Sequence, residues 1–225
     1  MTSPQPETWD HVARNLENIC ETIEQAAAAA NREPAGVRLV AVSKTFPVEA
    51  IRAALAAGHT LFGENRIQEA LPKIDTLTTV GASFHLIGHL QSNKARHAGE
   101  FGMVESVDSI KLARAIDKRL DHPLPILLEV NVSGEASKNG FRPDDLDRAC
   151  TEIQALPKLN VQGLMTVAPL AADPEEVRPY FRQLRELRDA LGLQELSMGM
   201  TNDFPVAIEE GATIVRIGRA IFGDR

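Results

Sequence analysis

A lysine and an arginine stand where two strands of this 225-residue chain are expected to end, and both could act on a small anionic ligand. Lys44 follows the apolar run 40–42 and Ser43, while Arg216 lies inside the apolar run 213–217. A desolvated amine near other cations can form a Schiff base with a carbonyl compound. A lysine at a strand end can equally be a rim residue whose charge reaches water. Both interpretations of Lys44 stay open at this point.

Arg216 needs a partner if its strand is buried. Side chains alternate along a strand, so Arg216 shares one face with Ile214 and Gly218. An unpaired charge among apolar neighbours is costly. The partner is either a carboxylate, for which Glu64 is the candidate, or a ligand atom such as a ring nitrogen or an anion. The residues alone leave this choice open.

Two glycines, Gly199 and Gly218, follow the last two expected strands, and each precedes a short helical stretch. The free N–H groups at a helix start favour an anion. The residues Thr201 to Asp203 are of the types that cap a helix. In a (β/α)₈ barrel the loops after strands seven and eight are the usual phosphate site. The pair of glycine loops therefore predicts bound phosphate, although either loop alone would be an ordinary turn.

Eight short β-branched runs alternate with helical stretches and must position these residues. The expected strands cover 37–42, 60–62, 83–87, 103–107, 125–130, 161–165, 195–198 and 213–217. The expected helices cover 47–57, 67–77, 93–100, 109–120, 144–156, 175–191 and 204–210, with a short turn at 219–222. Such alternation with short loops favours parallel pairing, and eight units favour a closed (β/α)₈ TIM barrel.

A further helix over 9–32 precedes the first strand and is expected to cover one side or the bottom of the barrel. No linker interrupts the chain. We therefore predict an α/β protein with a single domain over 1–225, in which 1–36 holds the leading helix and 37–225 the barrel.

Composition and missing motifs exclude several classes of function. The chain is 44% hydrophobic with a net charge of -7, so it lacks the basic character expected of a nucleic-acid binder. No GxGxxG, HExxH, GxSxG or P-loop motif is present, which leaves dinucleotide, metal and serine-hydrolase chemistry without support. Cys20 and Cys150 lack metal-like spacing and fit reduced thiols. With no apolar run in 2–10 and no stretch of roughly 18 apolar residues, we expect a cytoplasmic protein without a metal or membrane partner.

Three other candidates have ordinary structural roles available to them. Asn65 can cap a helix, His85 can be a hydrogen-bonded core histidine, and Met165 can pack in the core. Their positions at or near strand ends still place them beside the expected site.

An ordered set of short motifs runs from about residue 37 to the C-terminus. They are Val42-Ser43-Lys44-Thr45, Phe62-Gly63-Glu64-Asn65 with Gln68-Glu69, His85-Leu86-Ile87-Gly88, Leu90-Gln91-Ser92-Asn93-Lys94, Gly163-Leu164-Met165, Ser197-Met198-Gly199-Met200-Thr201, and Val215-Arg216-Ile217-Gly218 with Ile221-Phe222-Gly223. Taken together and in this order, they resemble the pyridoxal 5′-phosphate (PLP) homeostasis protein family. Any one motif is weak, but the ordered set is highly specific.

The resemblance implies a barrel like the N-terminal domain of bacterial alanine racemase, with PLP on Lys44 as a Schiff base and its pyridine nitrogen facing Arg216. Other residues that it implies at the cofactor are Asn65, His85 and Met165 near the ring, and Ser197, Gly199, Met200, Thr201, Gly218 and Arg219 around the phosphate. The family usually has Ser at the position of Thr201, and Thr or Ser at that of Arg219. The second difference removes one hydroxyl from the expected phosphate site.

Members of that family lack a firmly assigned enzymatic activity and are thought to bind, buffer or deliver PLP. The leading expectation is therefore a PLP-binding regulator of vitamin B6 supply, with no catalytic residue, and with PLP-dependent apoenzymes as candidate recipients. An always-charged arginine at the pyridine nitrogen weakens PLP as an electron sink, which fits a binder.

Two enzymatic alternatives remain, a PLP-dependent racemase-like enzyme and a Schiff-base aldolase that uses Lys44 without a cofactor. The leading helix and the barrel account for all 225 residues, and the only tyrosine, Tyr180, falls inside an expected helix. We therefore expect no closing domain with a second acid/base group, and a monomer rather than a racemase-type dimer.

Overall fold

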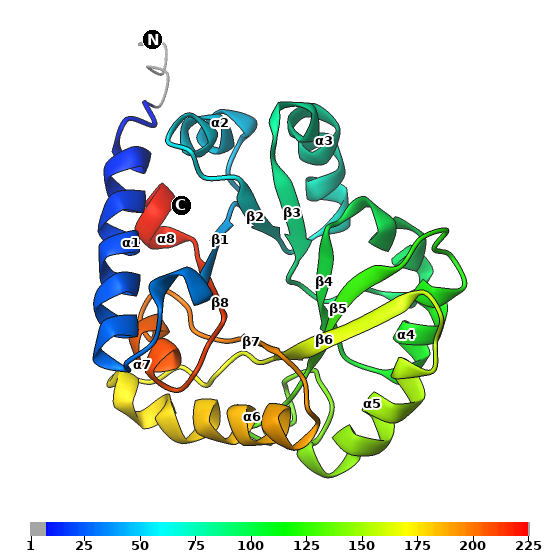
Figure 1. Ribbon diagram of the computed structural model, residues 1–225. Coiled ribbons are helices and arrows are strands. Elements are labelled where there is room, and N and C mark those ends of the chain that lie inside the picture. Colours follow the sequence, from blue (N-terminus) through cyan, green and yellow to red (C-terminus); the bar gives the residue numbers. More distant parts are fainter. Residues whose placement is uncertain (1–7, 225) are drawn as a thin grey trace.

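Eight parallel strands close into a barrel in which β8 pairs with β1 and every other strand pairs with its neighbours in the sequence (Figure 1). The computed structural model describes residues 8–224. The strands are β1 Arg38–Val42, β2 Leu61–Glu64, β3 Ser83–Leu86, β4 Met103–Val107, β5 Leu124–Glu129, β6 Leu159–Met165, β7 Glu195–Ser197 and β8 Ile214–Ile217. The predicted (β/α)₈ fold is confirmed.

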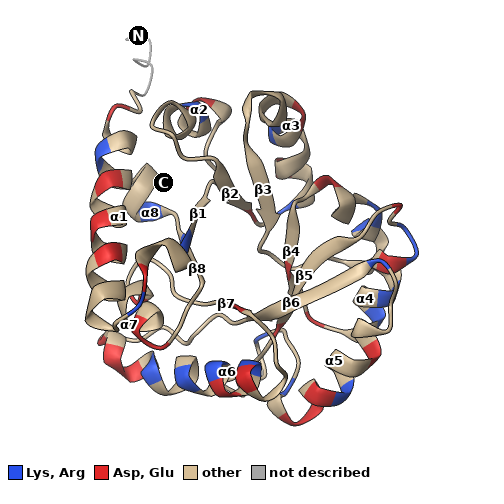
Figure 2. Cartoon of the chain, viewed as in Figure 1, with Lys and Arg blue, Asp and Glu red and all other residues tan. Residues whose placement is uncertain are grey.

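The helices form an outer layer around the strands (Figure 1). They are α1 His11–Ala29, α2 Val48–Ala56, α3 Ile67–Leu77, α4 Ile110–Asp117, α5 Leu146–Gln154, α6 Arg178–Ala190, α7 Phe204–Glu209 and α8 Arg219–Phe222. Charged residues gather on these helices, and few lie on the strands (Figure 2). Burial of a charged side chain is costly unless it is paired, so each charged residue on a strand inside the barrel needs a specific explanation.

Some expected helices differ from those observed. The segment expected as a helix over 93–100 is a 3₁₀-helix, Ser92–Glu100, which suits its content of weak helix formers such as Asn93 and Gly99. The expected helices 144–156 and 175–191 are shorter, because 3₁₀ turns at Pro143–Asp145 and Pro174–Val177 precede them. The expected turn at 219–222 is the one-turn helix α8.

The leading helix α1 lies on the side of the barrel, where it packs against α2, α7 and α8 (Figure 1). Its buried face includes Val12, Leu16, Ile19 and Ile23. The Asn15 Nδ2 atom also donates to the carbonyl oxygen of Ile221 at 2.9 Å. These contacts tie the first helix to the last and confirm that it covers one side.

Alternation along the strands fills the barrel interior with two kinds of residue. Apolar side chains form one buried layer, which consists of Val40, Met103, Leu127, Met165 and Ile214. One step further toward the carboxyl ends of β4 and β8 the inward residues are charged, namely Glu105 and Arg216. The interior is therefore sealed by apolar packing and becomes polar toward the mouth, where barrels of this kind place their chemistry.

Among residues 8–224, no helix is long and apolar enough to cross a membrane, and no group of His, Cys, Asp and Glu is placed to hold a metal ion. Both cysteines are free thiols, with Cys20 exposed and Cys150 buried.

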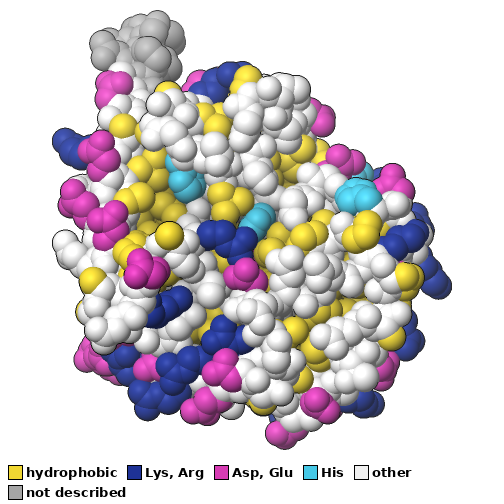
Figure 3. All heavy atoms as spheres, viewed as in Figure 1, with side chains coloured by type: hydrophobic (Ala, Val, Ile, Leu, Met, Phe, Trp, Pro, Cys, Tyr) yellow, Lys and Arg dark blue, Asp and Glu magenta, His cyan; other side chains and the backbone are white. Residues whose placement is uncertain are grey.

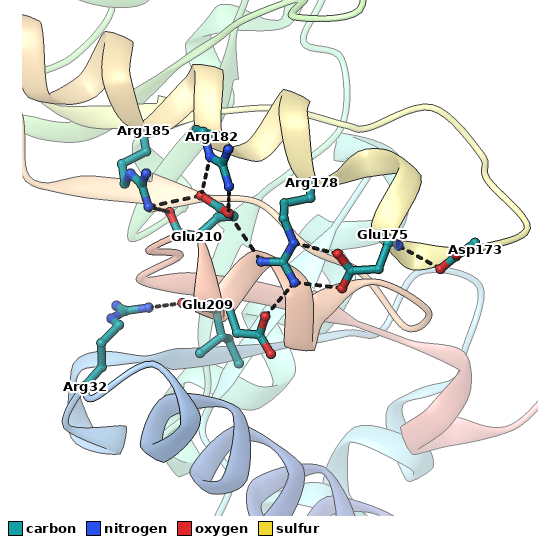
Figure 4. A network of polar contacts seen from close by, with 9 residues as sticks. Arg32, Asp173, Glu175, Arg178, Arg182, Arg185, Glu209 and Glu210 are labelled. Atoms are coloured by element: carbon teal, nitrogen blue, oxygen red, sulfur yellow. Dashed lines mark hydrogen bonds and ion pairs between the residues drawn. The ribbon is translucent and has the colours of Figure 1, made fainter.

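An arginine network joins α6 to α7 on the outside of the barrel (Figure 4). Glu210, which ends α7 and is 4% exposed, faces three arginines of α6. Its carboxylate lies 3.2 Å from Arg178 Nη1, 2.9 Å from Arg182 Nη2 and 3.0 Å from Arg185 Nη1. This outer network stabilises the contact between the two helices.

Helix α4 begins with a side-chain cap, because Ser109 Oγ accepts a hydrogen bond from the N–H of Leu112 at 3.3 Å. We expect Ser109→Ala to lower the free energy of unfolding by about 1 kcal/mol, since the N–H group loses its acceptor. Urea unfolding measures this difference. Ser109→Thr keeps the hydroxyl and should stay close to the wild type; an equal loss in both variants would show that capping is not the cause.

Candidate functional site

A cavity of about 720 Å³ opens at the carboxyl ends of the strands. Among the predicted site residues, those that line it are Lys44, Asn65, Met200, Thr201, Arg216, Gly218 and Arg219. The loop after β6 supplies much of the remaining wall through Val167 and residues 169–172. A cavity of this size suits a cofactor or other small molecule. Basic, acidic and histidine side chains also lie side by side near the centre of the face shown in Figure 3.

Arg216 reaches this cavity from β8 and is only 4% exposed. Its Nη1 atom donates to Ser197 Oγ, and its Nη2 atom donates to the carbonyl oxygen of Thr166 at 2.7 Å. The Oε2 atom of Glu105 lies 3.8 Å from Nη1 and supplies the opposite charge. The guanidinium is thus held in one orientation by groups on β7, on β4 and on the residue that follows β6.

Glu64, the carboxylate that the sequence offered as one possible partner of Arg216, does not pair with it. It is fully buried, and its Oε1 atom accepts hydrogen bonds from Ser43 Oγ and Lys73 Nζ, each at 2.7 Å. The reason is the alternation of β2. A Cβ atom on Gly63 would meet the inward residue Val40 at 2.7 Å, so Gly63 faces the interior and Glu64 faces the helix layer.

Glu105 is the buried carboxylate at the centre of the barrel. Its Oε1 atom lies 2.7 Å from His85 Nδ1, and its Oε2 atom accepts a hydrogen bond from Ser197 Oγ at 2.5 Å. Burial alone would raise the pKa of Glu105, but the hydrogen bond from His85 and the charges of His85 and Arg216 hold the pKa below its usual range. His85 and Ser197 do not line the cavity but hold the Glu105 carboxylate that lies beside Arg216.

The loops after β7 and β8 form the candidate phosphate cradle. Gly199 has a φ of 92°, and a Cβ atom there would lie 2.6 Å from Ala207 Cβ, so only glycine fits this bend. Within residues 8–224, the backbone N–H groups of Gly199, Gly218 and Arg219 donate to no other protein group. Together with the Thr201 hydroxyl, these donors have the chemistry that binds a phosphate group.

Asp203 also bears on this cradle. It occupies the N-cap position of α7, as expected, but its side chain does not cap that helix. Instead, its Oδ1 atom accepts a hydrogen bond from the N–H of Met200 at 2.6 Å. Burial raises the pKa of Asp203, while this hydrogen bond and the charge of Arg216 oppose the rise. A phosphate that used the Met200 N–H would have to replace this carboxylate.

Asn65 and Met165 take different places. Asn65 lines the cavity but does not cap α3, whose N-cap residue is Arg66. The backbones of Asn65 and Gly88 approach each other so closely that a Cβ atom on Gly88 would lie 2.4 Å from the Asn65 carbonyl oxygen. Met165 is 1% exposed and packs in the apolar layer of the barrel. Met165 therefore has the packing role that the sequence left open for it.

Glu129, at the end of β5, is a second carboxyl near the site that the sequence did not single out. Burial and the charge of Asp108 raise its pKa to about 6, while the charges of Arg216 and His89 oppose the rise. A carboxyl whose pKa is higher in the folded than in the unfolded protein contributes stability below its unfolded pKa of 4.5, and that contribution is lost as the pH rises through 6.

We therefore expect the free energy of unfolding of Glu129→Gln to exceed that of the wild type by about 2 kcal/mol above pH 6. Below pH 4.5 the two proteins should show no such difference. Urea unfolding across the pH range tests this. The exposed Glu21→Gln on α1 removes the same charge and serves as the control. An equal pH dependence in wild type and Glu129→Gln would contradict the assignment.

Comparison with known proteins identifies relatives along almost the whole chain. A family model described as alanine racemase, N-terminal domain, matches residues 14–225. The pyridoxal phosphate homeostasis protein of Pseudomonas aeruginosa is 46% identical over 220 residues, which cover 95% of this chain and 96% of that protein. Its counterpart in Aquifex aeolicus is 43% identical over 225 residues, covering 96% and 99%. PipY of Synechococcus elongatus, solved with PLP bound, is 39% identical, with a TM-score of 0.79 over 90% of this chain and 100% of PipY.

Proposed function

The chain belongs to the alanine racemase N-terminal domain family and, within it, to the pyridoxal phosphate homeostasis proteins. On this premise we propose that it binds PLP in the cavity at the carboxyl ends of the strands and acts in PLP (vitamin B6) homeostasis. One observation carries the proposal. A lysine, a fixed arginine and a cradle of N–H donors converge on a single cavity of about 720 Å³. This set matches three polar groups of PLP, namely its aldehyde, its pyridine nitrogen and its phosphate.

Each part is assigned to residues of this chain. When bound, PLP supplies an aldehyde that can condense with an amine, with release of water. We assign that amine to Lys44, which lines the cavity at the end of β1. We assign the phosphate to Gly199, Met200, Thr201, Gly218 and Arg219, and the environment of the ring to Arg216, Asn65 and His85. The guanidinium in place of a hydroxyl at Arg219 adds positive charge at the rim of the cradle.

For Ser197 we propose a different role from the phosphate contact that the resemblance implies. A hydroxyl group has a single proton, and that of Ser197 goes to Glu105, while its oxygen accepts from Arg216. No proton remains for a phosphate oxygen. We therefore assign Ser197 to the orientation of Arg216.

The same arginine fits a binder, although this pairing alone does not exclude catalysis. Its guanidinium stays charged and donates to Ser197 and Thr166, so it discourages protonation of a pyridine nitrogen placed against it. Tyr180, the only tyrosine of the chain, lies in α6 and packs against the outer core. It cannot serve as an acid or base in the cavity.

Addition of PLP to the purified protein tests the proposal. We expect absorption near about 420 nm, and borohydride reduction followed by peptide mass analysis should place a pyridoxyl group on Lys44. Absence of both signals at saturating PLP would overturn PLP binding through Lys44. The racemase-like alternative is measured on the same sample with L-alanine. Racemisation at ordinary enzyme rates, about 1 per second or faster, would overturn the binder.

We further propose that the protein acts as a monomer in the cytoplasm and passes PLP to PLP-dependent apoenzymes. The cavity supports the transfer step, because it opens at the strand ends and part of its wall is a loop that carries the exposed Leu170. Light scattering of the loaded protein measures its mass, and activation of an added apoenzyme measures transfer. A stable dimer, or activation no faster than with free PLP, would contradict these two points.

A further inference from the structure

A second lysine, Lys73 on α3, lies directly behind the segment that carries Lys44. It is 6% exposed, which is unusual for a lysine. Its Nζ atom lies 2.7 Å from Glu64 Oε1 and 3.2 Å from Glu69 Oε1. It also donates to the carbonyl oxygen of Ser43 at 2.9 Å. We call Glu64, Glu69 and Lys73 the ionic strut.

The ionic strut holds both peptide groups that flank Lys44. The carbonyl of the preceding peptide, that of Ser43, accepts from Lys73. The N–H of the following peptide, that of Thr45, donates to Glu69 Oε1. Glu64 adds a third restraint, because it accepts from the Ser43 hydroxyl at 2.7 Å. The backbone on either side of Lys44 is therefore fixed by charged groups.

The restrained backbone has a strained conformation. Thr45 has a φ of 68°, in the left-handed region that β-branched residues strongly disfavour. Such a conformation persists only where the surrounding structure imposes it, and it is common at functional sites. The hydrogen bond from Thr45 N–H to Glu69 supplies that constraint.

Stability alone explains the ionic strut poorly. A buried ion pair gives little net stability compared with apolar side chains of similar size. Among the described residues, the Oε2 atom of Glu64 is buried and has no hydrogen-bond partner, which adds a further cost. The ionic strut is costly to bury, yet it contacts the residues on both sides of Lys44. This combination indicates a role in positioning Lys44.

We infer that the ionic strut positions Lys44 for condensation with PLP, with Lys73 and Glu69 as its principal positioning residues. The inference rests on the proposed function. It distinguishes two parts of PLP recognition, since the phosphate cradle lies on other loops, those after β7 and β8, which the ionic strut does not contact. Loss of the ionic strut should impair the covalent step and leave recognition of ring and phosphate intact.

The experiment compares two ligands. PLP can condense with Lys44, whereas pyridoxine 5′-phosphate has the same ring and phosphate but an alcohol in place of the aldehyde. For Lys73→Met and Glu69→Leu we expect the Kd for PLP to rise about tenfold and the absorption near about 420 nm to form more slowly, because hydrogen bonds to charged groups are lost. The Kd for pyridoxine 5′-phosphate, measured by calorimetry, should stay within about twofold of the wild type.

Two controls make the test specific. Glu69→Gln keeps an oxygen that can accept from Thr45 N–H and should restore most of the PLP affinity lost in Glu69→Leu. Glu210→Leu removes the buried carboxylate of the outer arginine network (Figure 4), so it should lower stability without changing the Kd for PLP. The side chain of Glu69 is 25% exposed, so Glu69→Leu keeps the test available if Lys73→Met does not fold.

The outcomes separate the two claims. If folded strut variants bind PLP as the wild type does, or lose both ligands equally, the positioning role is overturned while PLP binding stands. If the wild type itself gives no absorption with PLP, the proposed function fails first. Selective loss of PLP affinity, with rescue by Glu69→Gln, supports the inference.

Discussion

Lys44→Ala is expected to abolish both the absorption near about 420 nm and the borohydride-stable adduct of the PLP-treated protein. Lys44 is the one lysine among the described residues that line the cavity. The two arginines of the lining, Arg216 and Arg219, carry guanidinium groups, which form no Schiff base with PLP. The variant therefore loses the covalent link, and we expect its Kd for PLP to rise about 100-fold.

The same variant should keep its affinity for pyridoxine 5′-phosphate, because Arg216 and the phosphate cradle are unchanged. Lys111→Ala, on the exposed face of α4, removes a lysine outside the cavity and should behave as the wild type. Persistence of the absorption in Lys44→Ala would show that another amine takes up PLP. Loss of both ligands would instead point to a disturbed β1–α2 turn.

The barrel and its mouth followed from local features of the sequence. Period-two and period-3.6 apolar patterns are set by neighbours within a few residues, so the order of strands and helices could be predicted without knowledge of packing. Once a barrel was expected, its geometry placed Lys44 and Arg216 at one end, since parallel strands bring their carboxyl ends together. The structure brings both residues to the same cavity.

The polar contacts inside the barrel were harder to predict from the sequence, because they join distant parts of the chain. Ser197 and Glu105 are 92 residues apart, and nothing local pairs them. A signal for Glu105 did exist, since it shares its strand face with Met103 inside an apolar run. Lys73 had no such signal. A Glu69–Lys73 pair four residues apart on a helix is typical of a solvated surface, and only packing against β1 makes it buried.

Loss of the Glu105 carboxylate should have the largest effect on stability. We expect Glu105→Ala to lower the free energy of unfolding by about 3–5 kcal/mol, because it leaves the buried Arg216 without its counter-charge and His85 and Ser197 without their acceptor. Urea unfolding at neutral pH measures the difference. Glu105→Gln keeps an amide oxygen in the same place and should lose less than Glu105→Ala.

The pH dependence identifies the cause of that loss. The pKa of Glu105 is lower in the folded protein than its value of 4.5 in the unfolded chain, so its contribution is complete above pH 4.5 and is lost as the pH falls through the folded-state pKa. The gap between wild type and Glu105→Gln should therefore narrow in acid, whereas Glu21→Gln on the surface should follow the wild type throughout. A gap that is constant with pH would mean that shape and hydrogen bonding, and not the charge facing Arg216, hold this part of the barrel together. Arg216 would then keep its orientation through Ser197 and Thr166 alone, and its charge would be free to act on whatever lies in the cavity.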